Sequence, residues 1–422
     1  MSQRVRDVLV VNRRRQELVT RILQDPSLRL SLVTEPGCLP DYPDTAGMES
    51  VTLVENVQNL DEVRHATLDL MNRYTFDAVV GPAESSIPTA GYLRSYLGMP
   101  GIPFDVAHAF CNKNAMKARL RRAGLTVARC TLVPSAESVG PFLRKHGLPT
   151  VIKPAWGDGA ANVHVVRDES DIAAISRPDG PLLSNDEAPF LIEDFVEFED
   201  EYHCDGLVRD GEVRFVSVSK YTRPPLRGKG SVFGSHTLPA DGDEARELAE
   251  LHGEVVRAMG LSDSVTHLEV FRTRDGLVVG EIACRPGGGG IPQTLRRAYG
   301  FDVWEHFLAT ELNRPLEWTP DAAEGIFAFL MFPVRPGVVR RVPDPDVFAD
   351  FPEVEKVDIK IGPGARISGM LYSTSMAGMA HCRVDSVDRI PGLVSALEKR
   401  FVVEYEDDEP EPRSEPRPEP TP

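Results

Sequence analysis

The stretch HLEVFRTRDGLVVGEIACRP, residues 267–286, contains two runs of alternating residues on either side of Arg274, Asp275 and Gly276. This pattern predicts a β-hairpin, because a glycine-containing turn separates two segments with the two-residue period of strands. Symmetry about Asp275 would place Glu269 opposite Glu281. Facing carboxylates have Cβ atoms ~4.5–5.5 Å apart and repel each other unless a positive charge lies between them. We therefore expect a divalent cation such as Mg²⁺ between these two glutamates.

Two other readings of the hairpin stay open from the sequence. Both glutamates could face solvent and tolerate each other. A β-bulge near the turn could also spoil the strict facing of the two carboxylates.

The residues after the hairpin indicate an anion site. Arg285 is followed by PGGGG at 286–290 and then by a helix with apolar residues on one face. Glycines before a helix leave backbone N–H groups accessible to an anion, and Arg285 adds a fixed cation. Combined with the paired glutamates, this segment predicts a site for a nucleotide and its metal.

Two upstream segments could contact the same nucleotide. The strand TVIKP (150–154) delivers Lys153 to the loop AWGDGAANV (155–163), which could hold phosphates by charge and by backbone donors. A surface lysine before an ordinary turn is the alternative. The segment PFLIEDFVEFEDEYHCDG (189–206) has apolar Phe195 and Val196 inside an acidic run. An adenine-binding linker would have this composition, but acidic runs are more often solvated faces.

The order of strand-like and helix-like segments predicts the domains. DVLVVN (7–12) and FDAVVGP (76–82) are buried-type strands that alternate with helices, which indicates a parallel α/β domain over residues 1–106. A mixed α/β domain is expected over 107–318, with a basic helix near 112–122 and another helix at 243–259. Residues 319–402 predict a smaller lobe with a last helix at 390–400. The acidic, proline-rich segment 403–422 is predicted to be disordered.

Composition excludes several classes of protein. The chain has 422 residues, 41% of them apolar, and a formal charge of −17, which would repel nucleic acid phosphates and anionic membranes. The start of the chain has no apolar core typical of a signal peptide, and no apolar run approaches the ~20 residues that cross a bilayer. We therefore expect a cytoplasmic protein. Its six scattered cysteines predict reduced thiols, since no CxxC pair is present.

Taken in order, these segments resemble the ATP-grasp family, especially its carboxylate–amine ligases that form dipeptides. The resemblance covers about residues 1–400 and includes the motif E-I-x-x-R-P-G-G at 281–288. It implies an N-terminal parallel α/β domain, a central ATP-grasp domain and a small C-terminal lobe. It also implies ATP and Mg²⁺ as cofactors, with Mn²⁺ as a substitute, and it is compatible with a homodimer.

The resemblance implies roles for individual residues. ATP phosphates would be bound by Lys113 and Lys153, under a closing loop that contains Gly157 and Gly159. The adenine-contacting linker would be Glu193, Asp194, Phe195 and Val196, and the ribose carboxylate would be Glu201. Glu269 and Glu281 would bind the metal. Arg285 would stabilise the acyl phosphate and the tetrahedral intermediate.

This chain departs from the family pattern at two places. The family commonly has a metal-binding asparagine where this chain has Ala283, and the glycine loop lacks the usual Ser and Arg. Hairpin symmetry pairs Ala283 with His267, whose imidazole could bind a second cation or donate to a phosphate oxygen. The alternative is that His267 merely packs over the alanine.

Candidate substrate-binding residues lie around the polar segment PPLRGKGSVFGSHTLP, residues 224–239. Basic side chains here could bind a substrate carboxylate and close the site against water; they are Lys220, Arg223, Arg227 and Lys229. His236 lies near the end of this segment, and Arg296 and Arg297 lie on the helix after the glycine run. A structural histidine and ordinary surface arginines are the alternatives for these three.

The predicted function is an ATP-dependent ligase that converts a carboxylate to an acyl phosphate and transfers it to an amine. The substrates would be two amino acids, and the resemblance suggests specialised metabolism. One alternative is a bicarbonate-activating enzyme similar to biotin carboxylase, although no Met-Lys-Met biotin-carrier signature is present. The other is a degenerate, non-catalytic ATP-binding protein, which the retained glutamates, lysines and arginine argue against.

Overall fold

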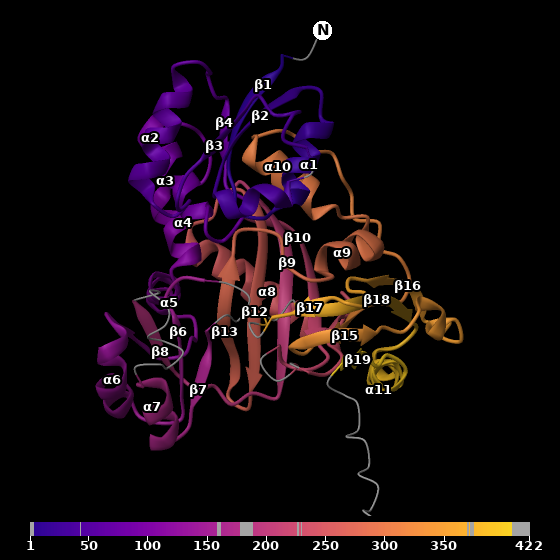
Figure 1. Cartoon of the computed structure of the whole chain (residues 1–422). Helices are drawn as coiled ribbons and strands as arrows, with labels where there is room; N and C mark the ends of the chain where they lie inside the picture. Colours follow the sequence, from indigo (N-terminus) through magenta and orange to yellow (C-terminus); the bar gives the residue numbers. More distant parts are fainter. Residues whose placement is uncertain are drawn as a thin grey trace, which may run out of the picture.

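The computed structural model of the chain describes residues 4–42, 44–157, 162–177, 189–225, 228, 230–368, 371 and 375–406. Figure 1 shows an N-terminal lobe above a large central sheet, with a smaller lobe at the lower left and the C-terminal segments at the right. Among the described residues, no helix is both long and apolar enough to cross a membrane.

The N-terminal lobe is the predicted parallel α/β domain. Its sheet has the order β3-β2-β1-β4, with strands β1 (Arg6–Val11), β2 (Leu28–Thr34), β3 (Ser50–Leu53) and β4 (Ala78–Val80). Helices α1 (Gln16–Gln24), α2 (Leu60–Met71) and α3 (Ile87–Leu97) connect or follow these strands. Residues 8–11 of β1 are fully buried, as expected for a parallel strand covered on both faces.

The expected domain boundary at residue 106 falls inside helix α4 (Phe104–Cys111). Val106 and Phe110 of this helix belong to the same hydrophobic core as Leu248 and Leu268 of the central part. The helix is therefore shared between the two parts, because it buries apolar side chains against the central core.

The smaller lobe at the lower left is an antiparallel sheet with the order β5-β8-β6-β7. Its strands are β5 (Cys130–Val133), β6 (Thr150–Pro154), β7 (His164–Val166) and β8 (Phe190–Asp194). Helices α6 (Val139–His146) and α7 (Glu169–Ile175) share its core. The preceding basic helix α5 (Lys113–Arg122) is followed by Gly124 with φ of +85°, as the sequence predicted.

The central sheet has eight strands in the order β13-β12-β9-β10-β11-β14-β18-β16. The first five in this order are β13 (Gly276–Ala283), β12 (Ser264–Thr273), β9 (Asp200–Arg209), β10 (Glu212–Tyr221) and β11 (Phe233–Thr237). The predicted helix at 243–259 is α8 (Asp243–Met259), which ends at Gly260. Helices α9 (Ile291–Tyr299) and α10 (Val303–Glu311) follow the hairpin.

Beyond residue 318 the described strands partly extend the central sheet and partly form a small sheet of their own. Strands β14 (Ile326–Pro333), β18 (Met376–Val384) and β16 (Val354–Ile359) extend the central sheet, because β14 pairs directly with β11. A three-stranded sheet of β17 (Arg366–Ile367), β15 (Gly337–Arg341) and β19 (Glu404–Tyr405) lies beside them. The last helix is α11 (Ile390–Arg400), as predicted.

The expected start of a disordered tail at residue 403 is wrong by a few residues. Strand β19 pairs with β15, and Tyr405 is buried and accepts a hydrogen bond from the backbone N–H of Arg335 at 2.9 Å. A buried aromatic ring thus keeps this segment in the fold. Residues 407–422, the rest of the predicted tail, lie outside the described residues.

Candidate active site

The hairpin of β12 and β13 places the two predicted metal carboxylates opposite each other. Glu269 pairs with Glu281, and His267 pairs with Ala283, as predicted. Nearer the turn, however, the register is shifted by one residue, since Thr273 pairs with Gly276 and Val270 pairs with Val279. The turn is therefore centred between Arg274 and Asp275, and an extra residue at Gly280 restores the facing of the glutamates.

Glycine leaves little spare room at this bulge. A Cβ atom at position 280 would lie 3.0 Å from the ring of Phe271 and 3.2 Å from the carbonyl oxygen of Glu269. The bulge also has a polar role, because the Gly280 carbonyl oxygen accepts a hydrogen bond from Lys117 Nζ at 3.2 Å.

Three lysines and two glutamates form a buried charge network beside the hairpin. Lys113 Nζ lies 3.2 Å from the Glu281 carboxylate and donates to the Gly157 carbonyl oxygen at 2.5 Å. Glu193 lies 3.1 Å from Lys153 and 3.5 Å from Lys117. The tertiary structure thus unites four predicted residues, and it adds Lys117. The sequence contained a signal for Lys117, which lies four residues after Lys113 on the same face of a basic helix.

The surrounding charges keep this network ionised. Burial alone would neutralise Glu281 and Glu193, but the nearby lysines outweigh it and lower the pKa of both carboxyl groups. Burial likewise opposes the charge of Lys113, and the carboxylates of Glu281 and Glu84 more than compensate, so its pKa is raised. Lys117 differs, because burial dominates and lowers its pKa.

Arg285 is held by a residue that sequence reasoning missed. Its Nε donates to the Glu84 carboxylate at 2.7 Å, and its Nη1 donates to the Pro286 carbonyl oxygen at 3.0 Å. Both side chains of the Arg285–Glu84 pair are buried. Glu84 lies in the loop after β4, so its only signal in the sequence was its place just beyond the predicted strand at 76–82.

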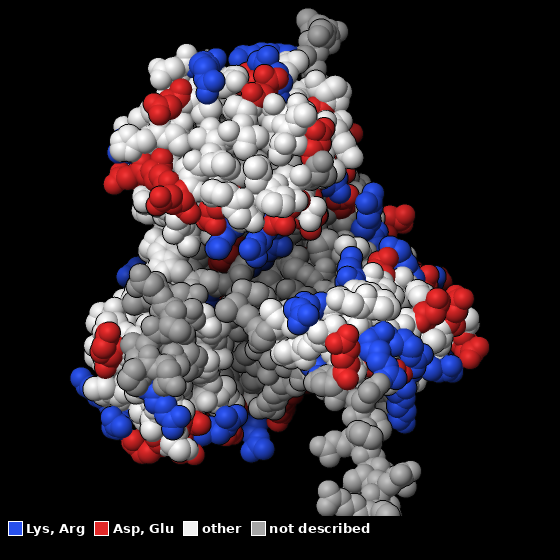
Figure 2. Space-filling view, in the orientation of Figure 1, with Lys and Arg blue, Asp and Glu red and all other residues white. Residues whose placement is uncertain are grey.

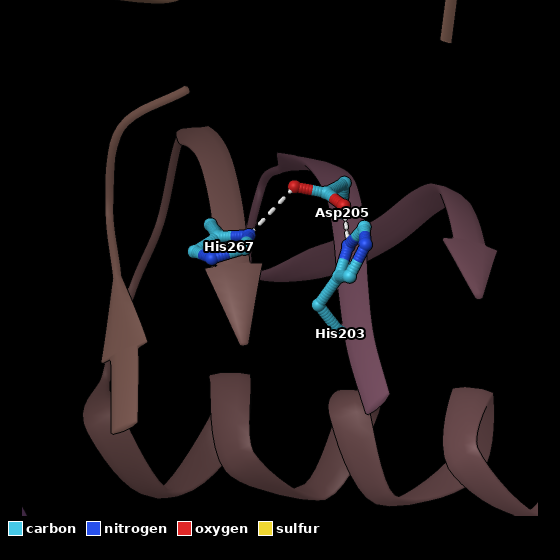
Figure 3. A group of neighbouring side chains, drawn as sticks. All are labelled: His203, Asp205 and His267. Atoms are coloured by element: carbon cyan, nitrogen blue, oxygen red, sulfur yellow. Dashed lines mark hydrogen bonds and ion pairs between the residues drawn. The ribbon is translucent and has the colours of Figure 1, made fainter. Parts of the chain in front are cut away.

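A hydrogen-bonded cluster of His203, Asp205 and His267 lies on the neighbouring strands β9 and β12 (Figure 3). Asp205 Oδ1 is 2.9 Å from His267 Nδ1, and Asp205 Oδ2 is 2.6 Å from His203 Nδ1. The three side chains are close enough to be a candidate metal site. Since both separations are those of hydrogen bonds, we interpret the cluster as a hydrogen-bonded chain that orients His267.

His267 does more than pack over Ala283. It lines the cavity described below, and its Nε2 lies 3.7 Å from the Glu269 carboxylate. Burial opposes a charge on the ring, but Asp205 and Glu269 outweigh it and raise the pKa of His267 to about 10. His203 and His267 together lower the pKa of Asp205, although its burial opposes this.

These groups surround one cavity of ≈ 640 Å³ between the lobes. Figure 2 shows the surface hollowed below the N-terminal lobe, with Lys and Arg side chains on the lobe's lower edge. The predicted residues that line the cavity are Lys113, Lys153, Gly157, Glu193, Asp194, Phe195, Val196, Glu201, Glu269, Glu281 and Arg285. Several other apolar side chains also line it. Four of them are here called the apolar wall: Phe233, Ile291, Phe329 and Met331.

Several predicted substrate residues do not line this cavity. Lys220 pairs with Asp200 at 2.8 Å, and buried His236 contacts the Thr237 carbonyl oxygen through Nδ1 at 3.1 Å. Arg296 is largely exposed and faces Asp302. Arg223 pairs with Glu398, and Arg297 pairs with Glu355. These side chains point elsewhere because each has a carboxylate or carbonyl partner outside the cavity.

Three predicted residues, Gly159, Arg227 and Lys229, lie outside the described residues. Within the linker, the Glu193 side chain turns to the lysines and Asp194 pairs with Arg129 at 2.9 Å. Phe195 and Val196 are thus the apolar side chains of this linker that line the cavity.

Parts of the chain match known proteins in sequence. An ATP-grasp domain is matched over residues 146–293. The chain is 34% identical over 341 residues to the L-arginine-specific L-amino acid ligase of Bacillus subtilis, which covers 79% of this chain and 82% of that relative. It is 24% identical over 271 residues to the alanine–anticapsin ligase of Bacillus subtilis, covering 59% and 56% of the two chains.

The fold is also similar to that of an amino acid ligase. The crystal structure of an L-amino acid ligase from Bacillus licheniformis superposes with a TM-score of 0.74 at 17% identity, and the match covers 96% of this chain and all of that one. The predicted ATP-grasp architecture is confirmed, and neither alternative function is favoured. The chain therefore belongs to the ATP-grasp family and is an ATP-dependent ligase that forms carbon–nitrogen bonds.

Proposed function

We propose that this ligase joins two amino acids, activating the carboxylate of one as an acyl phosphate and transferring it to the amino group of the other. The observation that carries the proposal is the shared cavity, where the facing carboxylates Glu269 and Glu281 lie with Lys113, Lys153 and Arg285. Such a set suits phosphoryl transfer, which depends on charge neutralisation and positioning more than on a protein nucleophile.

ATP would occupy the side of the cavity formed by the two sheets. Lys113 and Lys153 would bind its phosphates, with Gly157 beside them. Phe195 and Val196 would pack on the adenine ring, and Glu201 would accept from the ribose hydroxyls. Glu269 and Glu281 offer carboxylate oxygens on paired strands. These oxygens suit Mg²⁺, because this ion prefers oxygen ligands. When bound there, Mg²⁺ would supply positive charge to the phosphate oxygens.

The chemistry then needs two displacements. A carboxylate oxygen of the first amino acid attacks the γ-phosphorus of ATP, and ADP leaves. The amine of the second amino acid attacks the acyl carbon, loses a proton, and phosphate leaves. Arg285, held by Glu84 and the Pro286 carbonyl, would stabilise the oxyanion of the tetrahedral intermediate.

The apolar wall suggests the kind of side chain on the activated amino acid. Ile291 follows the glycine run after Arg285, and it belongs to one hydrophobic core with Phe233, Phe329 and Met331. The relative from Bacillus subtilis is named for arginine, whose guanidinium would need an acidic partner. The acidic residues among the described lining of the cavity belong to the nucleotide side. We therefore propose an apolar side chain.

The test is a screen of amino acid pairs with the purified protein, ATP and Mg²⁺. The proposal expects ADP and phosphate release with a product mass equal to two amino acids minus one water. Hydroxylamine added in place of the second amino acid should give a hydroxamate, because it traps the acyl phosphate. ADP formation with bicarbonate alone, or no turnover with any pair, would contradict the proposal. Faster turnover with arginine than with leucine or phenylalanine would contradict the apolar assignment only.

A further inference from the structure

The N-terminal sheet brings two loops to the edge that faces the cavity. Its strand order reverses next to β1, because β2 and β3 lie on one side of β1 and β4 on the other. In open parallel sheets, ligands bind outside the carboxyl ends of the strands at such a reversal. The loop after β4 already reaches the site, since it carries Glu84, the partner of Arg285. The loop after β1 contains Arg13, Arg14 and Arg15 and lies at the same edge.

This arginine loop has an enforced backbone conformation. Arg14 has a φ of +66°, in the left-handed region that residues other than glycine rarely adopt. The fully buried Asn12 holds the turn, since its Nδ2 donates to the Arg15 carbonyl oxygen at 2.9 Å and its Oδ1 accepts from the Arg15 N–H at 3.3 Å. Buried Tyr42 accepts from the Arg14 N–H at 3.3 Å. Backbone strain kept by buried polar side chains is a common feature of functional sites.

The turn directs the three arginines differently. Arg13 pairs with Glu35 at 3.1 Å and is not among the described residues that line the cavity. Arg14 and Arg15 both line it. The Asp41 carboxylate lies 3.7 Å from Arg14, which is longer than a hydrogen bond. A run of three identical residues is thus divided between a surface ion pair and the cavity.

We propose that Arg14 and Arg15 form the binding site for the α-carboxylate of the amino acid that supplies the amine. This inference rests on the proposed function. The planar guanidinium matches a carboxylate with two parallel hydrogen bonds. The lysines and Arg285 have proposed roles at ATP and at the acyl group. The amine donor needs a cation of its own, and these two arginines enter the cavity from the opposite lobe.

The proposal restricts the second substrate to amines with a free carboxylate nearby. The product would then keep a free carboxyl group, as a peptide does. Simple alkylamines and amino acid amides would be poor acceptors, because they lack the group that the two arginines bind.

The experiment uses the full chain and two different amino acids, so that the KM of the acceptor is measured with ATP and the activated amino acid saturating. In the double variant Arg14→Ala and Arg15→Ala, we expect the acceptor KM to rise about tenfold or more, with the KM for ATP unchanged. The wild type should prefer the free amino acid over its carboxamide, and the double variant should lose this preference. Arg13→Ala is the matched control and should change neither quantity.

Two results would overturn the proposal. One is an unchanged acceptor KM in the double variant, and the other is an unchanged preference for the free acid over the carboxamide. If the alanine variant fails to fold, Arg14→Gln and Arg15→Gln provide the same comparison with hydrogen-bonding side chains of similar length. Lysine at both positions should restore part of the preference, because it returns the charge without the planar fork. Absence of ligation by the wild type with every pair would instead refute the proposed function.

Discussion

Arg285 and Glu84 lie 201 residues apart in the chain, yet their side chains meet in a buried ion pair of 2.7 Å. One partner follows the hairpin of the central sheet, and the other follows β4 of the N-terminal lobe. The guanidinium at the proposed oxyanion position is thus oriented from the opposite lobe.

Removing the carboxylate should therefore affect both turnover and stability. In Glu84→Gln we expect kcat to fall at least tenfold, because Arg285 loses its charged partner. Breaking a buried pair leaves one charge uncompensated, which typically costs about 3–5 kcal/mol. Turnover assays and urea unfolding would measure the two effects. A variant with normal kcat but lower stability would show that the pair is structural only.

The phosphate and metal assignments can be tested by removing single charges. We expect Lys153→Ala and Glu281→Gln each to lower ligation at least ~100-fold, because each removes charge neutralisation from the phosphoryl-transfer step. The exposed ion pair of Arg144 and Glu169 offers a control, so Arg144→Ala should leave turnover unchanged. Near wild-type turnover in either active-site variant, with the thermal unfolding temperature intact, would refute the assignment.

His267 should influence the requirement for the divalent cation. Its ring is oriented by Asp205 and lies beside Glu269, so we expect His267→Ala to raise the Mg²⁺ concentration for half-maximal turnover several-fold. Adding Ala283→Asn should restore the lower requirement, since an amide oxygen would enter the facing position. Titration of turnover against Mg²⁺ gives the measurement. Unchanged Mg²⁺ dependence with normal turnover would leave His267 a structural residue.

Acid should destabilise the protein partly through Glu193. Its folded pKa lies below its ordinary value of 4.5, because Lys153 and Lys117 outweigh burial, so its contribution is present above that value and is lost as pH falls below it. We expect Glu193→Gln to be less stable than the wild type at pH 7, and the difference to shrink at pH 4 and below. Urea unfolding at both pH values would show this. A difference that stays constant with pH would contradict the ionised network.

The end of the chain should tolerate truncation up to a sharp limit. Residues 407–422 contain no apolar side chain, so we expect their deletion to leave activity and unfolding temperature nearly unchanged. Deletion from residue 403 onward should lower the unfolding temperature by several degrees, because it removes buried Tyr405 and its hydrogen bond with Arg335. Differential scanning fluorimetry of both truncated proteins would measure these effects. An equal loss of unfolding temperature in both would refute this limit.

On its own, the sequence determined the features that local residue patterns encode. The hairpin follows from strand alternation and a short turn, but the facing of Glu269 and Glu281 depends on the bulge at Gly280. Helix α8 with its terminal Gly260 and the parallel N-terminal domain follow from periodicity and from signals a few residues long. Such features depend on residues that are close together in the sequence, so the sequence alone predicts them.

Only the tertiary structure decided which distant side chains share the site. Glu84 and Lys117 join it, whereas Lys220, His236 and Arg296, which lie near the expected loops in sequence, turn to partners outside the cavity. The physical reason is that a charged side chain is directed by the nearest opposite charge or hydrogen-bond partner in space. The packing of whole sheets and helices decides which partner is nearby. Distance along the sequence does not predict that partner.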